Sequence, residues 1–210
     1  MNNGYHFRTR WRAAGTVEEV YDLISEPLGY PRWWPSVYLD VREIAPGDAG
    51  GLGRRIGLHT KGWLPYTLRW ESVATEMDRP QRLSLRAAGD FEGRGTWLLR
   101  QNSDFVDLVF DWQLSAEKPL LRYFSFLLKP VFSANHRWAM ARGEDSLRLE
   151  LARRRALSSA PLDTIAPPPG PNTTSGLWLI AGAAVMTLGL IALLRSVTQT
   201  QWKGERRCRT

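Results

Sequence analysis

The chain has 210 residues, a net charge of +7, ten tryptophans and a single cysteine. Because that cysteine, Cys208, lies in the charged C-terminal tail, the sequence excludes a disulfide framework and a cysteine-based metal site. Basic side chains are interleaved with acidic ones, and no stripe of basic and aromatic residues typical of RNA-binding domains occurs, so we expect no nucleic-acid partner.

Four segments of the chain differ in composition. Residues 1–156 have the length and apolar content of one domain with its own core. Residues 157–176 are rich in Pro and Ser, and they predict a semi-rigid, disordered linker. Residues 177–194 contain no charge and are just long enough to span a hydrocarbon core of about 30 Å, so they predict a transmembrane helix. Residues 195–210 form a basic tail.

The predicted transmembrane helix makes the membrane an expected partner. Gly182 and Gly189 offer a small-residue face for helix pairing. The basic tail favours a cytoplasmic C-terminus, which would place the domain outside the cytoplasm. The N-terminus, in contrast, does not have the pattern of a signal peptide. We therefore expect a single-pass C-terminal anchor with a cytoplasmic domain.

The domain begins with a predicted strand and helix. Residues 5–12 alternate between apolar or small and charged side chains, which is the period of a half-buried strand. Thr16 and Glu19 then form a capping box at the start of a helix from Val17 to about Ser25. Prolines break the following segment around Trp33 and Trp34, where we expect a short second helix or a tight turn.

Six further strands and a long helix follow. Short connections between the strands favour an antiparallel meander. An apolar spacing of three to four residues predicts the helix at 119–155, and Pro130 is expected to kink or divide it. The six strands are predicted at about 37–44, 54–61, 67–77, 82–89, 92–101 and 104–115.

This order of elements resembles the START and birch-pollen-allergen superfamily, in particular its polyketide cyclase/dehydrase and lipid-transport branch, often labelled SRPBCC. The residues that carry the resemblance are Val17–Ile24, the Tyr30–Pro35 cluster and the helix segment Asn135–Leu147, with glycines in the strands at 82–101. The resemblance covers residues 5 to about 155. It implies an α+β helix-grip fold, in which a curved antiparallel sheet of about seven strands wraps around the long C-terminal helix and leaves a cavity between them.

Strand alternation and helix spacing predict which side chains would line this cavity. The small residues Ala139 and Gly143 on the helix would leave space there, although a filled core is the alternative interpretation of the aromatic residues. Residues 61–66 are expected to form either a portal lip, a membrane-touching edge or a plain turn. The predicted ligand-binding residues are Phe7, Trp11, Leu68, Trp70, Leu85, Trp97, Leu99, Phe110, Trp112, Phe132, Asn135, Ala139 and Gly143.

Asn135 and His136 are the candidate catalytic residues, because they are the polar side chains expected nearest the cavity. A histidine in such a place is more often a satisfied core or surface residue than a base. Strand parity turns the possible carboxylate partners, Asp107 and Asp111, toward the wet face. Three scattered histidines do not form a zinc pattern, and no motif implies a cofactor.

Three hypotheses about function follow. The first is a membrane-tethered, non-catalytic binder or carrier of a hydrophobic small molecule or lipid, because apolar residues outnumber catalytic candidates. The second is an enzyme of the cyclase or dehydratase type acting on an apolar or aromatic substrate. The third is a membrane-anchored interaction module whose cavity is vestigial.

Overall fold

The computed structural model describes residues 4–115, 125–156 and 165–172, with side chains in the last helix described from Pro130 onward. Every strand and helix predicted within these ranges is present. The helical elements are α1 (Val17–Ile24), η1 (Pro27–Gly29), α2 (Tyr30–Trp33) and α4 (Ser125–Ala156). The strands are β1 (Gly4–Ala14), β2 (Tyr38–Ala45), β3 (Arg55–Lys61), β4 (Thr67–Asp78), β5 (Arg82–Gly89), β6 (Glu92–Asn102) and β7 (Phe105–Ser115).

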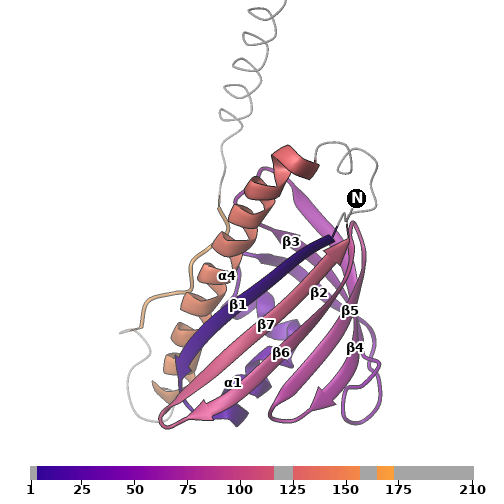
Figure 1. The fold of residues 1–210 in the computed structure, drawn as a ribbon. Helices are drawn as coiled ribbons and strands as arrows, with labels where there is room; N and C mark the ends of the chain where they lie inside the picture. Colours follow the sequence, from indigo (N-terminus) through magenta and orange to yellow (C-terminus); the bar gives the residue numbers. More distant parts are fainter. Residues whose placement is uncertain (1–3, 116–124, 157–164, 173–210) are drawn as a thin grey trace, which may run out of the picture. The chain divides into compact units, whose positions relative to one another are not determined.

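The strands form one antiparallel sheet in the order β1-β7-β6-β5-β4-β3-β2. Strands β2 to β7 are therefore the predicted meander. The first strand joins the meander by pairing with the last, with Gly4 opposite Ser115 and Ala14 opposite Phe105. Figure 1 shows the resulting sheet curving around one side of the long helix α4.

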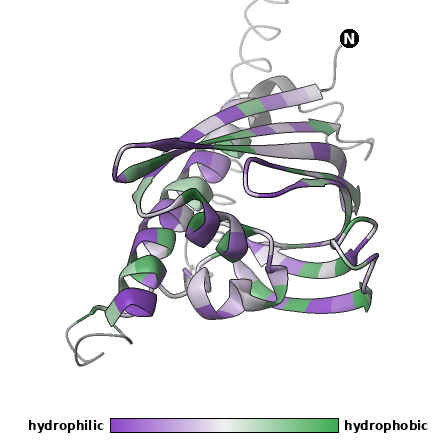
Figure 2. Ribbon diagram, turned by 90° about the horizontal axis from the view of Figure 1, so that it is seen from below, coloured by the Kyte–Doolittle hydropathy of each residue, from purple (hydrophilic) through white to green (hydrophobic). Residues whose placement is uncertain are grey.

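Period-two alternation separates the two faces of the sheet. In β7, Val106, Leu108 and Phe110 are buried, whereas the residues between them are partly exposed. On the outer face Asp111 accepts a hydrogen bond from exposed His6, at 2.9 Å between His6 Nε2 and the carboxylate. In Figure 2 the hydropathy alternates along the strands in the same way. The concave face of the sheet therefore carries the core.

The capping box at the start of α1 is formed as predicted. Thr16 Oγ1 accepts a hydrogen bond from the Glu19 amide at 3.2 Å, and the Glu19 carboxylate accepts one from the Thr16 amide at 2.8 Å. Arg155, near the end of α4, donates to the same carboxylate at 2.9 Å. The hydrogen bond from Arg155 and the bond to Thr16 lower the pKa of Glu19. This pair therefore joins the start of α1 to the end of α4.

The long helix α4 packs on the concave face through Met140, Leu147 and Leu151. Pro130 was expected to kink or divide this helix; it lies inside α4, which is not divided there, and the kink stays a prediction. The carboxylate of Glu150 is 2% exposed and lies 2.6 Å from the guanidinium of Arg32 on α2. Because a buried charge needs a partner, this ion pair helps fix α2 against α4.

Residues 165–172, the described part of the predicted semi-rigid linker, lie against the domain. They form no helix or strand, and Pro168 and Pro169 are half-buried. Arg153 donates a hydrogen bond to the carbonyl of Ala166, and Lys61 Nζ donates one to the carbonyl of Asn172 at 2.8 Å. We call residues 165–172 the strap.

No helix in the described part of the chain is long and apolar enough to cross a membrane. The predicted transmembrane helix at 177–194, with Gly182 and Gly189, lies outside the described residues. So do residues 157–164 of the linker and the basic tail. These three predictions stay predictions.

Candidate functional site

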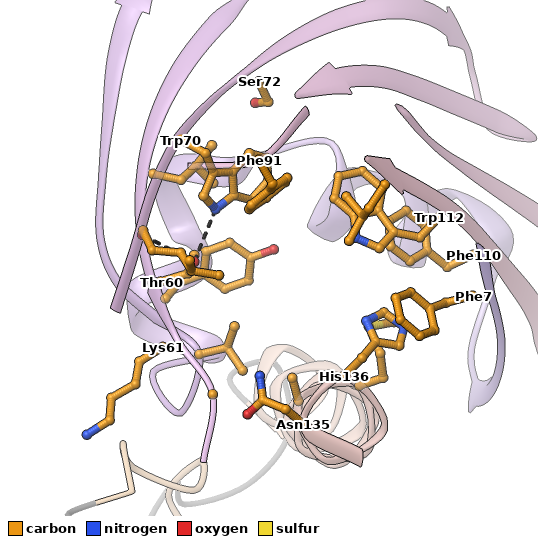
Figure 3. A pocket seen from close by; sticks show the side chains of 18 of the residues that line it. Phe7, Thr60, Lys61, Trp70, Ser72, Phe91, Phe110, Trp112, Asn135 and His136 are labelled. Carbon is orange, nitrogen blue, oxygen red and sulfur yellow. Dashed lines mark hydrogen bonds between the residues drawn. The ribbon is translucent and has the colours of Figure 1, made fainter. Parts of the chain in front are cut away.

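A cavity of about 270 Å³ lies between the concave face of the sheet and α4. This volume is close to the lower end of the range typical of small-molecule sites, about 300–1,000 Å³. Most of the residues around it are aromatic or aliphatic (Figure 3). Its lining includes Tyr5, Phe7, Trp11, Tyr30, Trp34, Tyr38, Leu58, Thr60, Lys61, Tyr66, Leu68, Trp70, Leu85, Asp90, Phe91, Trp97, Phe110, Trp112, Ser115, Phe132, Asn135, His136, Ala139 and Met140.

One end of the cavity is closed by packed tryptophans. The rings of Trp11 and Trp34 lie 5.3 Å apart edge to face, and those of Trp11 and Trp97 lie 4.8 Å apart. All three side chains are buried. Both separations lie within the range of favourable aromatic pairs. The cluster therefore forms a rigid floor.

At the other end, the residues that the structure describes leave the cavity open. Among the lining residues, Tyr66 and Ser115 are exposed, and Lys61 and Phe132 are half-buried. These positions belong to the loop after β3, the end of β7 and the first described turns of α4. We call this end the mouth.

Aromatic rings continue along the sheet wall from the floor toward the mouth. Phe110 stacks on Trp97 with ring centroids 4.4 Å apart, and Trp112 stacks on Phe110 at 5.4 Å. Gly95 lies beneath these rings, and a Cβ atom there would come within 2.6 Å of the Trp112 ring. The glycine therefore lets the two rings lie flat against the strand.

Most predicted ligand-binding residues line this one cavity, including Phe7, Trp70, Phe132 and Ala139. Leu99 and Gly143 do not. Leu99 is part of the buried core. A Cβ atom on Gly143 would come within 2.2 Å of the Trp34 ring, so the space left by this glycine is already filled by tryptophan. The prediction that Gly143 opens space for a ligand is wrong for this reason. Whether the lining residues bind a ligand stays a prediction.

Asn135 binds the backbone of the β3–β4 loop at the mouth. Its side-chain oxygen accepts hydrogen bonds from the backbone amides of Trp63 and Leu64, at 2.9 and 3.3 Å. Gly62 fits closely under this amide, because a Cβ atom there would lie 2.1 Å from Asn135 Oδ1. Asn135 thus fixes the loop between β3 and β4 against α4. In Figure 3 its nitrogen points toward the cavity, where it can donate to a ligand.

His136 lies on the same turn of α4 and faces β1. Its ring stacks on Phe7 with centroids 4.2 Å apart, and its Nε2 lies 3.3 Å from the hydroxyl of Thr9. Burial lowers the pKa of His136 to about 4, and the positive charge of Arg137 adds to the effect. The imidazole is therefore neutral at physiological pH and is a weak base.

No aspartate of the described residues lies within hydrogen-bond distance of His136. Asp111 is paired with His6 on the outer face, and Asp107 lies 3.6 Å from Arg12 there. Strand parity had predicted this outward orientation. The described residues contain no group of His, Cys, Asp and Glu side chains that could hold a metal ion.

Lys61 and Asp90, the charged residues of the lining within the described part of the chain, are held by other segments. The Lys61 ammonium donates to the carbonyl of Asn172, and in Figure 3 its side chain points away from the cavity. The Asp90 carboxylate accepts a hydrogen bond from the Arg69 amide at 2.9 Å. A ligand in the cavity would therefore meet an apolar surface with a few neutral polar groups.

The sequence analysis missed several neutral polar groups of the lining, among them the side chains of Tyr30, Thr60 and Tyr38. Tyr30 donates a hydrogen bond to the carbonyl of Ile24, and Thr60 accepts one from Trp70 Nε1 at 3.1 Å. The Tyr38 hydroxyl makes no hydrogen bond to another described residue, and burial raises its pKa, so it stays a neutral donor. Alternation of side chains in β2 could have placed Tyr38 on the inner face of the sheet. That strand is short and its alternation is weak.

We compared the chain with protein-family models, curated proteins and solved structures, and only the solved structures gave matches. No protein-family model matches the chain, and no curated protein matches its sequence. Among solved structures, the Zhui aromatase/cyclase from a Streptomyces species matches with a TM-score of 0.62 and 14% identity, over 75% of this chain and 99% of that protein.

Two further solved structures are similar. A START superfamily protein from Mycobacterium smegmatis has a TM-score of 0.53 and 14% identity, over 68% of this chain and 98% of its own. Norcoclaurine synthase from Thalictrum flavum has a TM-score of 0.51 and 12% identity, over 71% of this chain and 87% of its own. At such low identities the likeness concerns the fold alone, and it agrees with a helix-grip domain of α+β class.

Proposed function

We propose that this protein binds a neutral, hydrophobic small molecule or lipid in the cavity and is held at a membrane by residues 177–194. The observation that carries the proposal is a cavity of about 270 Å³ with aromatic walls whose charged lining residues are engaged elsewhere. Burying apolar ligand surface there would contribute roughly 25 cal/mol per Å². The START superfamily relationship suggested by the sequence supports the same proposal.

The polar groups of the lining narrow the ligand class. The Asn135 amide nitrogen and the Tyr38 hydroxyl are neutral donors. Lys61 is the one lysine or arginine of the described lining, and its ammonium points away from the cavity toward Asn172. An apolar molecule with one or two carbonyl, ether or hydroxyl oxygens satisfies such donors. A carboxylate or phosphate inside the cavity would lose its hydration without a compensating charge. We therefore expect neutral ligands to bind more tightly than their acidic analogues.

Binding is tested with a neutral, environment-sensitive dye such as Nile red. The purified full-length chain should bind the dye at a one-to-one ratio, and neutral apolar molecules should displace it. A matched pair of competitors, such as a long-chain alcohol and the corresponding fatty acid, should differ in favour of the alcohol. Absence of saturable dye binding by the folded chain would reject the binding function.

The membrane tether is tested separately by vesicle flotation. The full-length chain should float with vesicles and resist extraction at high pH, whereas a chain ending at Asn172 should remain in solution. This truncation follows the compact unit Met1–Asn172. The location of the domain on the cytoplasmic side of the membrane remains a prediction. Protease protection in cells would check it.

A cyclase-type or dehydratase-type enzyme is the second candidate function. It is favoured by His136 and Asn135, which both line the cavity, and by the fold shared with the aromatase/cyclase and the norcoclaurine synthase. His136 is a weak base without a described carboxylate to orient it, so the binding function remains the better supported one. If the protein is an enzyme, His136→Phe abolishes conversion of a bound substrate. If it is a binder, the same ligand is recovered unchanged from both proteins.

A further inference from the structure

The strap runs from one end of the domain toward the other. Arg153, which holds Ala166, is close to the C-terminal end of α4, whereas Lys61, which holds Asn172, ends β3 beside the mouth. Figure 1 shows the strap in orange beside α4. The chain therefore leaves the end of α4 and returns along it toward the mouth.

Geometry and composition are both consistent with a strap in this position. From Asn135, which contacts Gly62 next to Lys61, to Arg153 the helix rises roughly 27 Å. Six residues of polyproline conformation cover roughly 19 Å, and the long side chains of Arg153 and Lys61 reach across the remainder. The run Pro167–Pro169 restricts the backbone to such extended conformations, so little entropy is lost when the strap is ordered.

The strap ends close to the predicted membrane span. Four residues, Thr173 to Gly176, separate Asn172 from the start of the uncharged segment at Leu177. The five Cα steps from Asn172 to Leu177 cover at most roughly 18 Å. A span beginning at Leu177 must therefore enter the bilayer within this distance of Asn172, and Asn172 is hydrogen-bonded to a residue of the mouth.

We infer that the strap holds the mouth of the cavity against the bilayer surface, so that the ligand passes between lipid and cavity without crossing water. The inference rests on the proposed membrane tether. The side chains at the mouth suit this neighbour, because the ring of Tyr66 and the stem and ammonium of Lys61 are of the kinds that membrane interfaces favour. The closed tryptophan floor lies at the other end, so the mouth is the end through which an apolar ligand would exchange.

The test compares two labels of equal exposure at opposite ends of the sheet. Tyr66 is 39% exposed and lies at the mouth, and Phe105 is 40% exposed and lies at the β6–β7 turn. Each is changed to Cys in a Cys208→Ser background, labelled with bimane and reconstituted as the full chain into vesicles containing brominated lipid. Circular dichroism and thermal unfolding establish that both labelled proteins are folded.

Quenching at position 66 should exceed quenching at position 105 by at least threefold. Inserting about ten Gly and Ser residues after Asn172 adds a flexible reach of roughly 15–20 Å and should reduce this ratio by at least half. Flotation of the chain with the vesicles should not change, because the predicted span is intact.

Two results would overturn the inference, and they differ in what else they reject. Equal quenching at the two positions in a chain that floats with vesicles rejects the orientation of the mouth and leaves the tether and the binding function in place. Failure of the chain to float rejects the tether together with this inference. Dye binding by the chain in detergent is measured independently of both.

Discussion

Ala139→Leu tests whether the cavity is real space, because Ala139 lies on the part of α4 that lines it. The substitution adds three carbon atoms. At about 0.8 kcal/mol for each buried methylene, filling empty space could raise the free energy of unfolding by roughly 2 kcal/mol. The same atoms would displace a similar amount of ligand surface, which corresponds to a loss of roughly 30-fold in ligand affinity.

The assay combines urea unfolding of the ligand-free chain with Nile red titration. Ala88→Leu is the matched control, because Ala88 is exposed on the outer side of the sheet in β5. We expect Ala139→Leu alone to raise stability and weaken dye binding together. A loss of stability would mean that the leucine is forced into a filled core, and it would refute the reasoning.

Three further predictions concern α4. Gly143→Ala should lower the free energy of unfolding by about 1–3 kcal/mol because its methyl group meets the Trp34 ring, and a gain of about 1 kcal/mol, as in an open helix, would contradict this. Asn135→Ala should speed hydrogen exchange at the Trp63 amide, whereas Asn135→Asp keeps the acceptor and should preserve protection; equal exchange in both variants would reject the assigned role. His136 has a folded-state pKa of about 4, below its unfolded value, so its contribution to stability is present above pH 6.5 and is lost as the pH falls. Urea unfolding should show about 2 kcal/mol less stability at pH 5 than above pH 7, and His136→Phe should reduce this loss; an unchanged loss would count against a buried neutral histidine.

Local pattern was sufficient to predict most of the fold. Alternation in β1 and β7 identified their inner faces because one face packs on a core and the other meets water. The capping box located the start of α1 because its two hydrogen bonds are made within three residues. Such contacts depend on neighbours in the sequence and can be read from it directly.

Contacts between distant segments limited the prediction of the site. Gly143 was expected to leave space, but Trp34, more than a hundred residues earlier in the chain, fills it. Tyr38 enters the lining because β2 pairs with β3 at Thr60, a register that its own short pattern does not specify. The strap was missed because hydrogen bonds to the carbonyls of Ala166 and Asn172 do not depend on the side chains of those residues.

The central claim is that the space between α4 and the sheet holds an apolar molecule. Native mass spectrometry of the full-length chain, released from detergent micelles, tests it most directly. We expect a second mass corresponding to one bound apolar molecule, which organic solvent extracts and which Ala139→Leu greatly reduces. A single mass equal to the bare chain, together with no uptake of added Nile red, would contradict the account.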